Sequence, residues 1–95
     1  MDSNQDGNHM AKSAQDFQTE LDKIFTSVVQ IPGISGIKIK SGDLHEIVGD
    51  YPGKDHRMSV CCDTMRKNMK EGDTIINDTP SGQSASLIIL YQIPR

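Results

Sequence analysis

The chain has 95 residues, of which 35% are apolar, with two Phe, two Tyr and no Trp. This is enough for one domain with a modest core. No apolar run approaches the roughly 18 residues of a membrane-spanning helix, and the sequence opens on no basic and apolar leader, so we expect a cytoplasmic protein without a membrane partner. Two cysteines in a reducing compartment should remain thiols.

The net charge of −3 is unevenly distributed along the chain. Residues 1–24 contain five acids and two lysines, which accounts for the whole excess, whereas residues 54–70 carry five cations against two acids. Because an anionic partner responds to a local patch as well as to the total, the overall acidity weakens a nucleic-acid function without excluding it.

Residues 1–13 are polar and have almost nothing to bury, so we expect a disordered tail ahead of one domain at 14–95. The stretch 14–30 predicts a helix, because its apolar residues recur at the spacing of one helical face, and Pro32 and Gly33 end it. Residues 35–40 alternate isoleucine with lysine and predict a short strand.

Residues 41–49 predict a second helix of two turns, with Ser41 as its N-cap. We expect its buried face to consist of Leu44, Ile47 and Val48, and we expect His45 on the polar part at the surface. The sequence "YPGKD" then predicts a turn, whose last residue, Asp55, could cap the next helix.

A third helix is predicted at 56–70, where methionines and cysteines share one stripe: Met58, Cys61, Cys62, Met65 and Met69. Buried free cysteine behaves as a small apolar residue and methionine fills irregular gaps, so this stripe predicts core rather than chemistry. Residues 74–93 contain two runs rich in β-branched residues around "DTPSGQS", which predicts a hairpin.

This order of elements resembles the winged helix-turn-helix superfamily over residues 14–94. In that resemblance "SGDLHEIVG" and "DHRMSVCCDTMRKNMK" correspond to the helix-turn-helix, "IKI" joins the hairpin in a three-stranded sheet, and "NDTPSGQSA" is the wing. The implied fold class is α+β, a winged helix-turn-helix with three helices, a short strand and a C-terminal β-hairpin. The implied function is a small protein that reads duplex DNA with helix 56–70, such as a transcriptional regulator or a mobile-element factor.

In this model the polar face of the third helix meets DNA. Arg57 would pair with guanine, Val60 would meet a thymine methyl group, and the late cations would face phosphates. The wing has no lysine or arginine, so it would offer hydroxyl, amide and backbone groups. The expected DNA-binding residues are His56, Arg57, Ser59, Val60, Thr64, Arg66, Lys67, Lys70, Ser81 and Gln83.

Other interpretations of the same residues remain open. The polar face could be an ordinary solvated one, and the acidic first helix and uncharged wing would also suit a protein-interaction module that binds no nucleic acid. A metal site at Cys61 and Cys62 is disfavoured, because adjacent helical cysteines point about 100° apart, and we expect no cofactor and no enzymatic activity. Val29 and Ile31 lie beside the core stripe of the first helix and suggest a homodimer.

Overall fold

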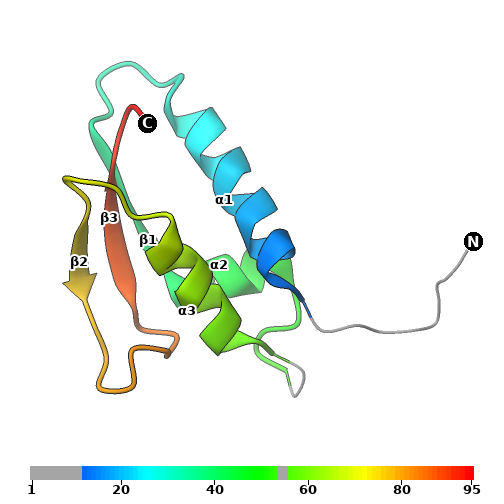
Figure 1. Cartoon of the computed structure of the whole chain (residues 1–95). Coiled ribbons are helices and arrows are strands. Elements are labelled where there is room, and N and C mark those ends of the chain that lie inside the picture. Colours follow the sequence, from blue (N-terminus) through cyan, green and yellow to red (C-terminus); the bar gives the residue numbers. More distant parts are fainter. Residues whose placement is uncertain (1–11, 54–55) are drawn as a thin grey trace, which may run out of the picture.

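The computed structural model describes residues 12–53 and 56–95. Residues 1–11 of the expected tail at 1–13 and the expected cap Asp55 lie outside the described residues, whereas Ser13, at the end of that expected tail, caps α1. The six elements follow the predicted order (Figure 1). They are α1 (Ala14–Val28), β1 (Gly36–Lys40), α2 (Ser41–Val48), α3 (Met58–Lys67), β2 (Thr74–Asn77) and β3 (Ile88–Gln92).

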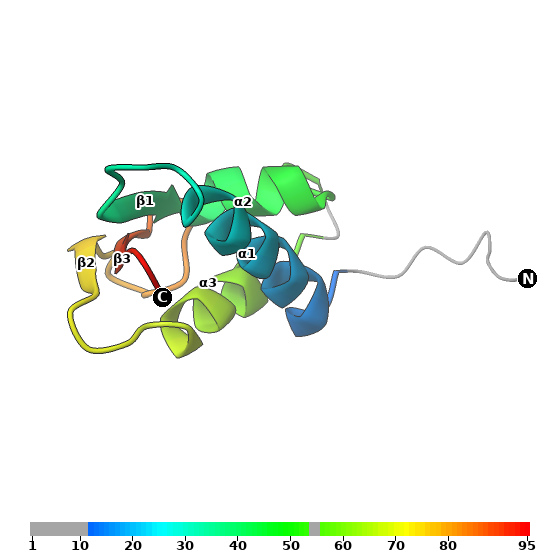
Figure 2. The same ribbon diagram turned by 90° about the horizontal axis from the view of Figure 1, so that it is seen from above.

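The strands form one antiparallel sheet in the order β1-β3-β2, with the C-terminal strand in the centre. β1 pairs with β3 so that Ile39 faces Ile89, and β2 pairs with β3 up to a register shift between Ile75 and Asn77. The helices gather on one side of this sheet (Figures 1 and 2). The predicted α+β class is therefore confirmed, and the topology is consistent with a winged-helix fold.

The ends of α1 follow local sequence signals. Ser13 and Asp16 form a capping box, in which the Ser13 hydroxyl accepts from the Asp16 N–H and the Asp16 carboxylate accepts from the Ser13 N–H. The helix ends at Val28, two residues before the predicted boundary, and Gly33 then turns the chain at a φ of 85° that side chains with a Cβ rarely adopt.

The core lies between the helices and the inner face of the sheet, where side chains from all three helices meet β1 and β3. It consists of Phe17, Leu21, Ile39, Leu44, Met58, Cys61, Cys62, Met65, Leu87, Ile89 and Tyr91. Both cysteines are free thiols and fully buried, so the prediction of a core stripe on the third helix is confirmed. Burial raises the pKa of the Cys61 thiol to about 12.

The buried face of α2 differs from the prediction. Ile47 was expected in the core, but its side chain is 61% exposed, whereas the expected surface residue His45 is fully buried together with Ser41. The reason is that His45 supplies a hydrogen-bond acceptor that an isoleucine cannot. Its Nε2 accepts from the Arg57 N–H at 2.8 Å, and its ring packs edge-on against Phe17.

The third helix is shorter than predicted at both ends. It begins at Met58 because Arg57 has an extended φ of −124° and a ψ of 57°, and its N–H is bound by His45. It ends at Lys67, where the Asn68 side chain donates to the Thr64 carbonyl and pairs with Gln18 of α1. His56 and Arg57 therefore precede the helix, and Lys70 follows it.

Arg95 lies between α1 and the sheet. Its guanidinium bonds both carboxylate oxygens of Asp73, at 2.9 and 3.0 Å, and donates to the Asn68 carbonyl at 2.6 Å. It also lies over the rings of Phe25 and Tyr91. Both members of the ion pair are nearly inaccessible to solvent, so each depends on the other for compensation of its charge.

Candidate nucleic-acid interface

One exposed stripe runs along α3. Ser59, Asp63 and Lys67 are all exposed and are spaced four residues apart, so they lie on one face of the helix, opposite the buried methionines and cysteines. Figure 2 shows α3 along one margin of the molecule, on the side away from β1. We call Ser59, Asp63 and Lys67 the α3 stripe.

Further basic side chains extend this surface beyond both ends of the helix. His56 and Arg57 are exposed ahead of α3, and Lys70 is exposed after it. Val60 is half-buried and packs against the core, so only part of its side chain faces outward. The predicted residues from 56 to 70 therefore share one side of the molecule only in part.

The predicted position of Thr64 on the polar face is wrong. It was expected on the polar face, but only 5% of its surface is exposed, and its hydroxyl donates to the Val60 carbonyl one turn earlier at 2.8 Å. A threonine in a helix can satisfy its hydroxyl in this way, which lets it face the interior. Thr64 is thus unable to read a base from its position in this structure.

Arg66 also differs from the expected free cation. Its guanidinium bonds the Asp78 carboxylate at 2.7 Å and the Gly82 carbonyl at 3.1 Å, and so connects α3 to the loop between β2 and β3. The Thr79 N–H and then the Arg66 guanidinium lower the pKa of Asp78. The positive charge of Arg66 is therefore already paired within the protein.

Residues 78–87, which we call the wing loop, lie against the helices along much of their length. The Ser41 hydroxyl and the Cys62 thiol both donate to the Ser84 carbonyl, at 2.6 and 3.3 Å, and the Gly42 N–H donates to the Ala85 carbonyl at 3.0 Å. A larger residue in place of Gly42 would crowd this contact, because a Cβ would lie 3.0 Å from Ala85 atoms. The loop base is thus attached to the start of α2.

The tip of the wing loop reaches the α3 stripe. Gln83 is exposed, and its Nε2 donates to Asp63 Oδ1 at 3.3 Å. Ser81 is exposed beside it and accepts a bond from the Gln83 N–H. Both predicted wing residues therefore lie next to the exposed surface of α3, although the loop contributes no positive charge of its own.

Sequence reasoning missed the roles of two residues. His45 joins α2 to the residues ahead of α3, since its Nε2 accepts from the Arg57 N–H while its ring contacts those of Tyr51 at a tilt and His56 edge-on. Asp63 lies at the centre of the α3 stripe. Its spacing of four residues from Ser59 and Lys67 was the available signal, whereas no pattern in the sequence indicates the inward orientation of His45.

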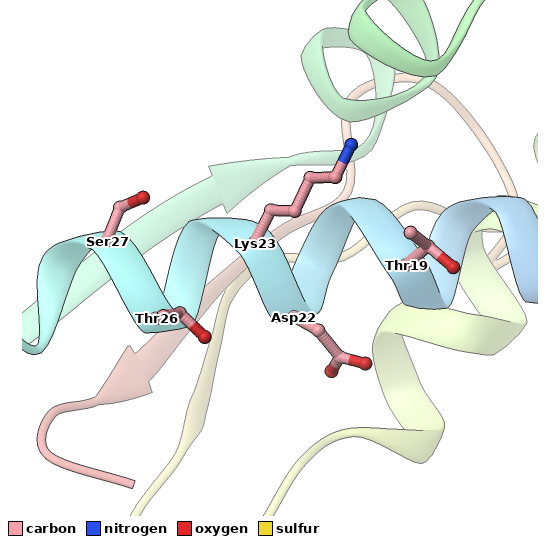
Figure 3. Close-up of a pocket in the computed structure, with 5 residues that line it drawn as sticks. All are labelled: Thr19, Asp22, Lys23, Thr26 and Ser27. Carbon is pink, nitrogen blue, oxygen red and sulfur yellow. The ribbon is translucent and has the colours of Figure 1, made fainter.

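One hollow of the described surface lies along α1. Figure 3 shows that Lys23 and Ser27 point to one side of this helix and Asp22 and Thr26 to the other, so these groups do not converge. Within residues 12–53 and 56–95, no three His, Cys, Asp or Glu side chains gather closely enough to hold a metal ion. No helix in the same part of the chain is long and apolar enough to cross a membrane.

An apolar groove lies away from α3. It is lined mainly by isoleucine and leucine side chains of α1, β1 and α2, and Lys38, Lys40 and Asp43 line it as well. Comparisons of the chain with models of known protein families, with curated proteins and with solved structures found no match.

Proposed function

We propose that this protein is a small winged helix-turn-helix protein that binds duplex DNA through α3 and the wing loop. The observation that carries the proposal is the α3 stripe. A helix with an exposed polar face, set beside a hairpin loop and flanked by Arg57 and Lys70, has the form with which many DNA-binding domains enter the major groove.

The role of each residue in DNA binding would depend on its position along α3. Ser59 and Asp63 lie near the N-terminal part of α3, which in such complexes meets base edges, and Arg57 lies just ahead of them. Lys67 and Lys70 would face phosphates, where contact positions the protein without reading sequence. Ser81 and the exposed backbone of the wing loop would add neutral contacts, whereas Thr64 and Arg66 are already used inside the protein.

The test is a titration of a fluorescent duplex of random sequence at low salt, read by anisotropy. We expect binding that weakens to roughly the 1–100 µM range at physiological salt, as is typical of non-specific contacts. Lys67→Glu should abolish it. Lys23→Glu is the matched control, because Lys23 is an exposed lysine of α1, away from the proposed surface, and the same charge reversal there should leave binding nearly unchanged.

A protein-interaction module is the second candidate function, and the apolar groove favours it. Ile24, Ile37 and Leu44 line this groove beside the highly exposed Ile47, and the adjacent Lys38 and Lys40 suit a partner that carries acidic residues next to apolar ones. The same titration separates the two candidates, since an interaction module leaves the duplex unbound at low salt in the wild type and both variants.

A further inference from the structure

Asp63 is an unexpected residue at the centre of a surface that meets a polyanion. It is the middle member of the α3 stripe, one turn from Ser59 and one turn from Lys67, and it is exposed. A carboxylate beside phosphates is repelled, so at this place it lowers the affinity for every duplex. An acid at the reading face can offset this loss by selecting among sequences.

The chemistry of base edges indicates what such an acid selects. In the major groove cytosine presents only an amino donor, whereas adenine presents an amino donor beside an acceptor, guanine two acceptors, and thymine one acceptor and a methyl group. An ionised carboxylate has acceptors only. It therefore gains a hydrogen bond from cytosine without meeting an acceptor, and it faces repulsion from the acceptors of adenine, guanine and thymine.

The wing loop holds this carboxylate in place. Gln83 donates to Asp63 Oδ1, and among the described residues Oδ2 has no hydrogen-bond partner, so one oxygen is anchored and the other is free to accept. The anchoring bond comes from the loop tip, across 20 positions of sequence, and it restricts the rotation of the side chain. Gln83 is in this sense a positioning residue.

We propose that Asp63 is the specificity-determining residue of α3 and selects cytosine at one base pair of the bound duplex. This inference rests on the proposed function. The size of the preference should be that of one good base contact, roughly 5- to 150-fold over the other bases at that position.

Replacement by asparagine gives a directional prediction. The Asp63→Asn side chain keeps its shape but loses the charge and gains a donor, and an asparagine amide pairs with the donor and acceptor of adenine. The preferred base at that position should change from cytosine to adenine. The affinity for random duplex should rise several-fold at the same time, because the repulsion of phosphates is removed.

The experiment is selection of bound duplexes from a random library, followed by sequencing, with wild type, Asp63→Asn, Gln83→Ala and Glu71→Gln. Glu71 is an exposed acid beyond the end of α3, so Glu71→Gln removes the same charge away from the stripe. We expect a cytosine preference in wild type and Glu71→Gln, a weaker one in Gln83→Ala, and adenine at that position in Asp63→Asn.

The outcomes distinguish this inference from the proposed function. If wild type binds duplexes but shows no cytosine preference, or if Asp63→Asn keeps the preference of wild type, the role of Asp63 is wrong while DNA binding stands. If wild type retains no duplex at low salt, DNA binding and the role of Asp63 both fail.

Discussion

The dependence of DNA affinity on salt should report how many cations of the proposed surface meet phosphates. Lys67 and Lys70 are exposed on that surface and are proposed to face phosphates. Arg57 lies beside the base-reading part of α3, and Arg66 is paired with Asp78 and Gly82. At about 0.9 per phosphate contact, the two lysines predict a slope of log affinity against log salt of about −1.8. Between about 50 and about 200 mM salt, affinity should then fall about 12-fold.

Single substitutions show how much each cation contributes to this slope. Lys67→Ala should reduce it to about −0.9, so that the same change of salt weakens binding only about 3.5-fold. Arg66→Ala should leave the slope at about −1.8, because its charge is already neutralised within the protein. The assay is anisotropy titration of one duplex at four salt concentrations. The reasoning is refuted if Lys67→Ala keeps the full slope, or if Arg66→Ala lowers it by a whole contact.

Three further predictions concern stability and assembly. Arg95→Ala should cost about 3 kcal/mol in chemical denaturation, because it leaves the Asp73 carboxylate buried without its partner, and a loss below 1 kcal/mol would contradict this. Burial raises the pKa of Asp73, but the hydrogen bonds from Arg95 and from backbone N–H groups outweigh burial and leave this pKa below its usual value of 3.8. The stability lost in Arg95→Ala should therefore shrink as the pH falls below 3.8. The folded chain keeps the Cys61 proton up to a pH of about 12, whereas the unfolded chain loses it near 9.0. The free energy of unfolding should therefore fall between pH 9 and pH 10 by up to about 1.4 kcal/mol, and by less in Cys61→Ala. Equal slopes of stability against pH in the two proteins would refute this. Val29 and Ile31 are 42% and 49% exposed, and sedimentation should show a dimer that Ile31→Lys dissociates, whereas a monomer at high concentration would argue against it.

Periodic patterns in the sequence predicted the main elements of the fold. The Met58, Cys61 and Met65 stripe has the period of a helix whatever lies around it, and the alternation at Ile37 and Ile39 has the period of a strand, so both could be placed from sequence. The buried face of α2 could not be predicted in this way. Eight residues give too few turns to distinguish two neighbouring faces, and a tertiary hydrogen bond from Arg57 drew His45 inward and left Ile47 exposed.

The candidate surface was predictable in outline but not in detail. The sequence shows which residues can face away from a buried stripe, and Ser59 and Lys67 do so. It does not show which polar groups are bonded inside the protein. Thr64 turns to its own helix backbone, and Arg66 finds Asp78 across 12 positions, because the hairpin brings the loop to α3 only after folding.

The attachment of the wing loop also has a consequence for the entropy of binding. Fixing one residue of a flexible chain costs about 1–2 kcal/mol, and a free loop of this length would lose that freedom when it met a ligand. Here Ser41 and Gly42 bind Ser84 and Ala85 of the loop, and Arg66 binds Asp78 at its other end. The ordering cost has been met during folding, and the loop presents a preformed shape to whatever binds there.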